Sequence, residues 1–146
     1  MKVVLDTNVL IAGIFFGGIP GRIVDAWTNS KFQVYATPQI LKEYLRVLDE
    51  FFKKNPANGS RFNWTAILPE LCHLVPDIKS KRSFSRDPLD DKFVLCAIRT
   101  RSSYIVTGDD DLLVLSLVNK TKIISPRKFI EALKILAAFS KWQISY

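Results

Sequence analysis

Short apolar runs that alternate with segments of helical periodicity limit most strongly the folds open to this chain. The runs have the length and composition of buried strands, and each is followed by a helical pattern. Strands that alternate with helices indicate a parallel sheet covered on both faces. We therefore predict a three-layer α/β/α fold with a central, mostly parallel sheet of about four or five strands. The expected strands cover residues 2–5, 32–36, 104–107 and 122–124, and the expected helices cover 9–17, 20–28, 38–53, 64–71, 88–100, 111–117 and 126–138.

The chain has 146 residues, a length that fits one domain of ordinary size. We expect this domain to span residues 1–138, with a C-terminal tail at 139–146. The least regular part is 55–86, where prolines interrupt the pattern. No apolar run approaches the ~20 residues that span a bilayer, and the N-terminal residues do not resemble a signal peptide. We therefore expect no membrane segment and a cytoplasmic location.

The histidine and cysteine content argues against several kinds of site. His73 is the only histidine, so it cannot by itself build a zinc site or a Ser-His-Asp triad. Cys72 and Cys96 lie in apolar surroundings without C-x-x-C spacing, and we expect both to be small core residues. The net charge of +7 is weak evidence for a polyanionic partner, because many basic proteins bind no nucleic acid.

Two of the expected strands lead into aspartates. The first strand is followed directly by Asp6, and the 104–107 strand is followed by Asp109 after Gly108. Because ligands of parallel α/β sheets bind outside the carboxyl ends of the strands, both carboxylates should reach the same edge. Each aspartate alone fits an ordinary surface turn equally well.

Two further segments carry carboxylates toward this edge. Glu43 lies early in the 38–53 helix, at the border of its apolar stripe, where the helix dipole also favours an acid. In the stretch 87–91, Asp87 precedes a proline and fits a helix N-cap. Helical periodicity does not choose between Asp90 and Asp91 as an inward-facing acid.

Carboxylates that meet in one pocket raise one another's pKa and do not all stay ionised. A hard divalent cation such as Mg²⁺ removes this conflict, because it takes oxygen ligands and keeps several waters. One of those waters can serve as a nucleophile. The run of three aspartates at 109–111 therefore suggests a metal site built together with the other segments, whereas Asp110 is expected to be solvated.

Four motifs in order along the chain resemble those of the PIN-domain ribonucleases, especially the VapC-like toxins of toxin-antitoxin modules. The motifs are VLDTNVL at 4–10, PQILKEY at 38–44, DKFVLCA at 91–97 and IVTGDDDLL at 105–113. The resemblance covers roughly residues 2–134 and implies a PIN-like fold. The chain departs from the family in having Gly108 where many members have arginine, and in its long segment 55–86.

The resemblance implies that four acids hold Mg²⁺ or Mn²⁺ and support hydrolysis of RNA phosphodiester bonds. The family's first two acids match Asp6 and Glu43, the third fits Asp91 better than Asp90, and the fourth matches Asp109. Asp111 is a further candidate ligand. The resemblance also implies a small antitoxin protein as a partner and a homodimer.

Other polar residues are candidates for supporting roles. Thr7, Asn8 and Thr107 are placed to orient the carboxylates or bound water. Candidate RNA contacts lie in the basic stretch before Asp87, with Phe84 as a stacking ring among them. These basic residues are Lys81, Arg82 and Arg86.

Three other functions are alternatives to a nuclease. A phosphoacceptor signalling domain needs an acceptor aspartate after a middle strand and usually a lysine after a late one, but the strands at 32–36 and 122–124 run into Thr37-Pro38 and Ser125-Pro126. A phosphatase of the D-x-D type is disfavoured because Asn8 replaces the second aspartate. The remaining alternative is a non-catalytic PIN-like module that binds RNA or protein.

Overall fold

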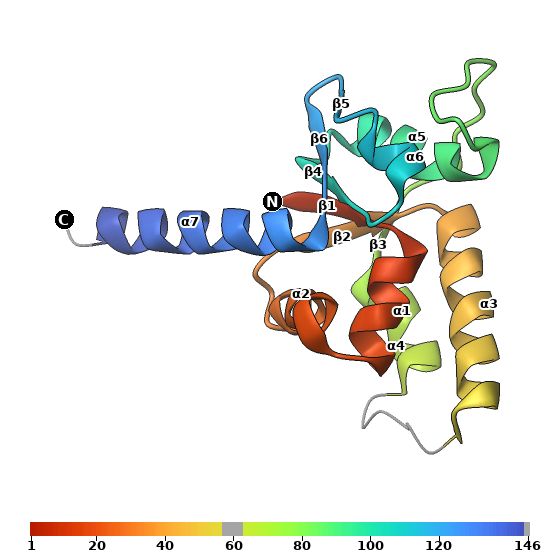
Figure 1. The fold of residues 1–146 in the computed structure, drawn as a ribbon, viewed down its shortest axis with the longest axis horizontal. Coiled ribbons are helices and arrows are strands. Elements are labelled where there is room, and N and C mark those ends of the chain that lie inside the picture. The colour runs from red at the N-terminus through yellow and green to blue at the C-terminus, as the bar shows by residue number, and fades with distance from the viewer. Residues whose placement is uncertain (57–62, 145–146) are drawn as a thin grey trace.

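A computed structural model describes residues 1–56 and 63–144 of the chain. It confirms the predicted three-layer architecture, with a mostly parallel sheet between helices (Figure 1). Residues 57–62 of the segment predicted to be irregular, and 145–146 of the predicted tail, lie outside the described part. Figure 1 shows α5 and α6 on one side of the sheet and α1, α2 and α4 on the other. The helices are α1 (Thr7–Phe15), α2 (Gly18–Thr28), α3 (Pro38–Lys54), α4 (Trp64–Leu71), the 3₁₀ helix η2 (Pro88–Asp90), α5 (Asp91–Thr100), α6 (Asp110–Leu113) and α7 (Pro126–Ile144).

The sheet has six strands in the order β3-β2-β1-β4-β6-β5, two of which the sequence did not predict. All neighbours are parallel except β5 and β6, which form an antiparallel pair. Both unpredicted strands are two residues long and lie at the sheet edges, too short for an alternating pattern to mark them. The strands are β1 (Lys2–Leu5), β2 (Gln33–Ala36), β3 (His73–Leu74), β4 (Tyr104–Val106), β5 (Leu117–Val118) and β6 (Thr121–Ile124).

Strand β1 occupies the centre of the sheet and sets the position of the first acid. Leu5 pairs with Val106 of β4, and the amide of Asp6 then donates to the Val106 carbonyl at 3.0 Å. The carboxyl ends of β1 and β4 therefore lie side by side. As the sequence predicts, Asp6 and the residues after β4 emerge at the same edge of the sheet.

The start of α3 follows the predicted capping chemistry. The Thr37 side chain accepts a hydrogen bond from the amide of Ile40 at 3.3 Å, and Pro38 occupies the first helical position. The buried face of the helix contains Ile40, Tyr44 and Leu48. Tyr44 donates its hydroxyl to the Leu5 carbonyl, which ties α3 to the end of β1.

Two cysteines belong to the apolar core, as predicted. Cys72 and Cys96 are free and buried, and burial raises the pKa of each thiol to about 12. Both thiols are therefore protonated at neutral pH and act as small apolar side chains.

Helix α7 continues beyond the end that periodicity predicted near residue 138. Residues 139–144 of the predicted tail are its last turns, and Figure 1 shows this helix projecting away from the rest of the molecule. Its outer part exposes Ile135, Leu136 and Phe139. Within the described residues no single helix is long and apolar enough to cross a membrane. In the described part of the chain, α1 and α2 taken together reach that length and composition, across a bend of 94°.

The contact between α1 and α2 requires a glycine at position 13. A Cβ atom added to Gly13 would lie 2.5 Å from Val24 Cγ2 and 2.6 Å from the Pro20 carbonyl oxygen. Gly21, on α2, has room for the same atom, since its nearest neighbour would be at 3.7 Å. The two positions therefore differ in packing.

We predict that Gly13→Ala lowers the free energy of unfolding by about 1–3 kcal/mol, because backbone atoms must move to relieve the overlap. Gly21→Ala should be neutral or slightly stabilising, since alanine is the better helix former. Urea unfolding followed by circular dichroism measures both. Equal stability of Gly13→Ala and wild type would contradict the close approach.

Candidate metal centre

Asp6 is a buried carboxylate at the end of β1, 6% exposed. Thr107 donates its hydroxyl to Asp6 Oδ2 at 2.6 Å, and the backbone amide of Asn8 also donates to this carboxylate. Burial nevertheless raises the pKa of Asp6, and the nearby charges of Asp109 and Glu43 raise it further. Thr107 thus contacts the first acid through its side chain, and Asn8 does so through its backbone amide.

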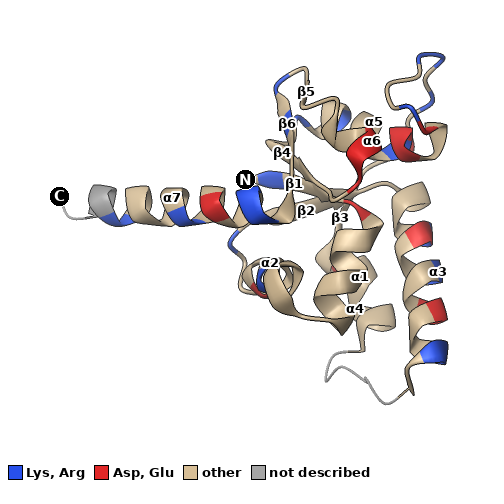
Figure 2. Ribbon diagram, in the orientation of Figure 1, with Lys and Arg blue, Asp and Glu red and all other residues tan. Residues whose placement is uncertain are grey.

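Three carboxylates converge after β4 and at the start of α5. One oxygen from each of Asp90, Asp109 and Asp111 lies within 4.8 Å of the other two, the only such group of three within the described residues. Figure 2 shows acidic segments gathered where α6 and the beginning of α5 meet the end of β1. The three residues supply oxygen donors alone, which is the ligand set of a hard cation.

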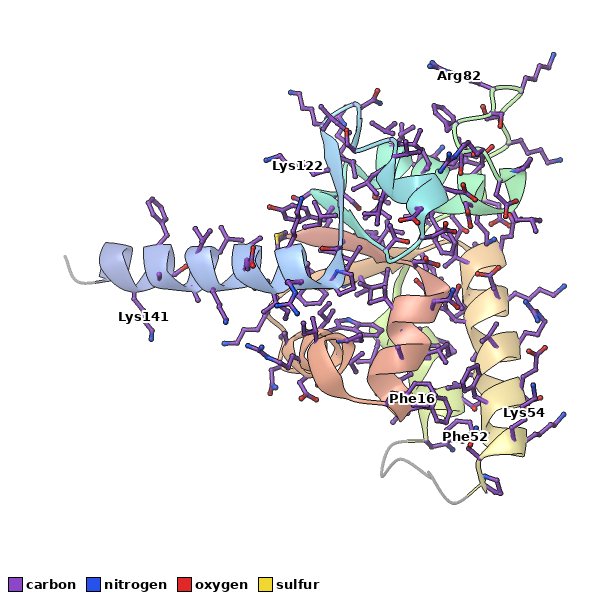
Figure 3. All side chains as sticks on the ribbon, viewed as in Figure 1. Phe16, Phe52, Lys54, Arg82, Lys122 and Lys141 are labelled. Atoms are coloured by element: carbon purple, nitrogen blue, oxygen red, sulfur yellow. The ribbon has the colours of Figure 1, made fainter. Side chains whose placement is uncertain are left out.

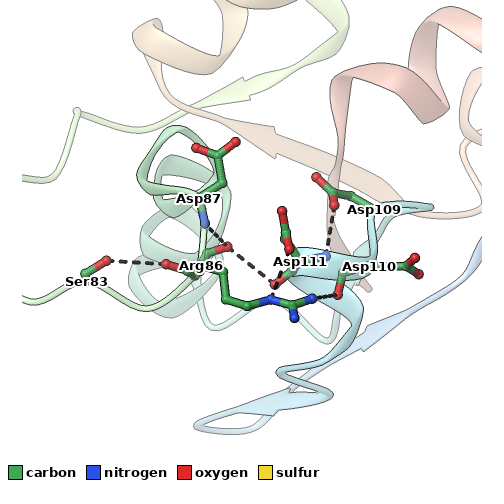
Figure 4. Close-up of polar contacts among 7 residues, drawn as sticks. Ser83, Arg86, Asp87, Asp109, Asp110 and Asp111 are labelled. Atoms are coloured by element: carbon green, nitrogen blue, oxygen red, sulfur yellow. Dashed lines mark hydrogen bonds and ion pairs between the residues drawn. The ribbon is translucent and has the colours of Figure 1, made fainter.

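Local hydrogen bonds fix the orientation of Asp109. Its side chain accepts from the amide of Asp111 at 2.9 Å and so caps α6, as Figure 4 shows. Its own amide donates to the Thr107 hydroxyl at 3.0 Å. Thr107 therefore links Asp6 to Asp109. Asp110, as expected, is exposed.

Asp90 is the least compensated acid of the group. Its Oδ2 atom is buried and has no hydrogen-bond partner within the described chain. Burial, together with a hydrogen bond to Asp109 and the charges of Asp109, Asp6 and Asp87, raises the pKa of Asp90 to about 7. An orphaned buried oxygen beside two other carboxylates fits a bound cation, which would supply the missing partner.

Asp91, the residue favoured by the family motif, has a different set of contacts. Its Oδ1 accepts from the amides of Phe84 at 3.2 Å and Ser85 at 2.7 Å, and its Oδ2 accepts from the Ser83 hydroxyl at 3.1 Å. The structure thus brings Asp90, and not Asp91, to Asp109 and Asp111. Asp91 instead accepts hydrogen bonds that hold the segment 83–85 beside the acids.

Glu43 approaches the same edge from α3, and both of its oxygens have partners. Thr7 donates its hydroxyl to Oε2, and Lys92 Nζ lies 3.0 Å from Oε1. The charge of Glu43 acts on Asp6. Glu43 is therefore near the acidic group, but its charge is already balanced.

Of the predicted RNA contacts, Arg86 lies closest to the acids. Its Nε is 3.0 Å from Asp111 Oδ1, and its guanidinium also donates to the Asp110 carbonyl at 3.4 Å (Figure 4). Lys81 and Arg82 are exposed, and the Arg82 guanidinium lies 5.0 Å from the centroid of the Phe84 ring. Figure 3 shows Arg82 at the far end of the loop that precedes η2.

Sequence reasoning missed the pairing of Lys92 with Glu43 and did not settle the role of Asp90. One signal for Lys92 was available, because a cation in the first turn of a helix opposes the helix dipole and needs another partner. No comparable signal marks Asp90. Which of the two adjacent acids faces segment 83–85 depends on the fold of that segment and not on the local sequence.

One groove in the described surface lies away from these acids. A groove of about 580 Å³ runs between α2 and α7, and its lining is apolar with four basic residues and no carboxylate. It has no donor set for a cation. The candidate site is therefore the group of acids at the carboxyl ends of β1 and β4 and at the start of α5. We call this region, with Asp6, Glu43, Asp90, Asp109 and Asp111, the acidic edge. The groove is lined by Met1, Arg22, Ala26, Lys31, Ile130, Leu133, Lys134, Leu136, Ala137, Ser140 and Lys141.

Asp90 and Asp91 give opposite predictions for the metal-free protein. The pKa of Asp90 is raised in the fold, so its ionisation destabilises the protein progressively as pH rises from about 4 to about 7. Relative to wild type, Asp90→Asn should gain stability over this range, by on the order of 1–2 kcal/mol at pH 8, because solvent screens part of the repulsion.

Asp91→Asn should instead lose about 1–2 kcal/mol, because the charge-assisted hydrogen bonds to Phe84 and Ser85 are weakened. Urea unfolding with a chelator present, at about pH 4.5 and pH 8, measures both variants. If the difference in unfolding free energy between wild type and Asp90→Asn did not change with pH, the pKa of Asp90 would not be raised in the fold.

Comparison with known proteins agrees with the motifs. A family model described as PIN domain matches residues 2–111, a range that contains every acid described above. The uncharacterized protein MJ1680 of Methanocaldococcus jannaschii is 34% identical over 143 residues, covering 90% of each chain. PIN domains are commonly nucleases that use divalent metal ions. The chain belongs to the PIN-domain family.

Proposed function

We propose that this protein is a divalent-metal-dependent endoribonuclease that hydrolyses RNA phosphodiester bonds with a metal-activated water, as the toxin of a toxin-antitoxin pair. The observation that carries this proposal is the convergence of Asp90, Asp109 and Asp111, with a buried and unpartnered Asp90 oxygen, in a PIN-domain chain. Mg²⁺ or Mn²⁺ suits these oxygen donors.

The proposed ligands are drawn from Asp6, Asp90, Asp109 and Asp111. Asp90 replaces Asp91 in this set because Asp91 is engaged by the backbone of 83–85. Glu43 borders the ligands and acts electrostatically on Asp6. A cation at this point would relieve the repulsion that raises the pKa of Asp6 and Asp90.

A bound divalent ion supplies the Lewis acidity that lowers the pKa of water and orients it for attack on phosphorus. The protein's own contribution is orientation. Thr107 holds Asp6, the Asp111 amide holds Asp109, and Thr7 holds Glu43. Each of these bonds reduces the freedom of a carboxylate before any ligand arrives.

We expect the basic segment before η2 to contact the RNA backbone. Arg86 lies against Asp111, so a phosphate at the acidic group would meet its guanidinium. Lys81 and Arg82 extend this positive charge, and Phe84 offers a ring for base stacking. The segment thus supports RNA as the substrate class.

The partner proposals come from the family resemblance. We propose a small antitoxin protein as a partner and a homodimer as the assembly. We also propose a cytoplasmic location. The exposed apolar residues on the outer part of α7 support an interface between copies.

We predict that wild-type protein cleaves total RNA when Mg²⁺ or Mn²⁺ is present and is inactive with a chelator. Asp109→Asn should lower the cleavage rate by on the order of 100-fold or more, because it removes a ligand and a negative charge. Gel analysis of time courses gives the rates. Asp49→Asn is the matched control, since Asp49 is an exposed acid paired with Lys53 at 3.0 Å on α3.

The alternative function, a non-catalytic module that binds RNA or protein, makes a different prediction for the same assay. RNA would then be bound, as seen in gel shifts, but not cut with either ion. Equal cleavage by wild type and Asp109→Asn would point to a contaminating nuclease and would contradict the proposed site.

We predict a solution mass of twice the 16.6 kDa of the chain, measured by light scattering on a sizing column. Ile135→Glu should shift the protein toward the single-chain mass, because Ile135 is 69% exposed on α7 and a buried charge would disrupt an apolar interface. A strictly single-chain mass for wild type at high concentration would rule out the dimer.

A further inference from the structure

Lys92 holds one of the acids that the metal centre was expected to use. Its ammonium lies 3.0 Å from Glu43 Oε1 and also donates to the carbonyl of Leu89. The second oxygen of Glu43 accepts from Thr7. Both oxygens of Glu43 are therefore engaged by the protein, one of them by a full positive charge.

The ion pair between Lys92 and Glu43 is built into the fold. The Lys92 side chain is 9% exposed and its Nζ lies 5.0 Å from the centroid of the Phe93 ring, whereas the ion pair of Arg46 with Glu50 on α3 is 60% and 54% exposed. A buried ammonium costs free energy unless it is paired. Lys92 therefore depends on Glu43 in a way that a surface lysine does not.

Helix α5 does not account for a lysine at this position. Lys92 lies in the first turn of α5, where the helix dipole disfavours a cation. Glu43 does account for it, because its carboxylate pairs with the Lys92 ammonium. The charges of both Glu43 and Asp109 raise the pKa of Asp6. The acidic edge thus has two parts that meet at Asp6: Glu43, which is neutralised by Lys92, and the group of Asp90, Asp109 and Asp111.

We propose that Lys92 takes the place of a second divalent cation beside Glu43, so that the centre holds one ion, at Asp90, Asp109 and Asp111. This inference rests on the proposed function and states how many ions the site takes. An ion bound at Glu43 would have to displace the Lys92 ammonium or share an oxygen with it, against the repulsion of like charges. Lys92 is thus a positioning residue, which fixes Glu43 and supplies its counter-charge.

Counting bound Mn²⁺ tests the inference without any nuclease assay. Metal-free protein is titrated with Mn²⁺, and the free ion is followed by electron paramagnetic resonance. Wild type should bind one tight Mn²⁺. Lys92→Met should bind two, because Glu43 is left as an unpaired carboxylate, and adding Glu43→Gln to Lys92→Met should return the count to one.

Two control variants separate this effect from charge and from misfolding. Lys122→Met removes the same charge from an exposed position on β6 and should stay at one ion. Lys92→Arg keeps a cation beside Glu43 and should also stay at one. If Lys92→Met does not fold by circular dichroism, Lys92→Gln, which removes the charge but keeps a donor, is measured in its place with the same expected gain.

The outcomes distinguish this inference from the proposed function. Two tight ions on wild type, or one ion on both wild type and the folded Lys92 variant, would overturn the role of Lys92 while leaving a metal centre in place. A wild type that binds no Mn²⁺ would overturn the metal centre itself, and the inference with it.

Discussion

Repulsion among carboxylates at the carboxyl ends of β1 and β4 is the constraint on which the rest of the site depends. Asp6 and Asp90 both have raised pKa values, and in each case burial is the first cause and neighbouring acids add to it. The fold brings Asp6 and Asp109 together because β1 and β4 are parallel and in register, so their carboxyl ends lie side by side. The acids are thus held close by the sheet in spite of their charge.

The protein compensates part of this charge with its own cations. Lys92 balances Glu43 from inside the site, and Arg86 balances Asp111 from the loop before η2. Within the described chain, Asp6, Asp90 and Asp109 have no ion-pair partner. A divalent ion at these acids would balance their remaining negative charge. The same ion would then both stabilise the fold and support the proposed cleavage of RNA.

Local chemistry made much of the fold predictable. Thr37 before a proline and Asp87 before a proline both proved to be helix caps, and the strand ends placed Asp6 and Asp109 at one edge. Strands β3 and β5 were not predictable, because two-residue strands are defined by their partners and not by their own pattern.

The site was predictable only in part for the same reason. Adjacent acids at 90 and 91 look alike in sequence, and the choice between them depends on the backbone amides of 83–85, which return to Asp91 from a segment with no regular structure. The pairing of Lys92 with Glu43 joins two helices that are distant along the chain, so helical spacing could not reveal it.

The most direct test of a cation site at the acidic edge is the melting temperature of metal-free protein at neutral pH with and without Mn²⁺. Mn²⁺ at a hundred times its dissociation constant should raise the melting temperature of wild type by about 5–10 °C. The rise should be largely lost in Asp109→Asn. A wild type whose melting temperature does not respond to Mn²⁺, or an equal rise in both proteins, would contradict a cation site at these acids.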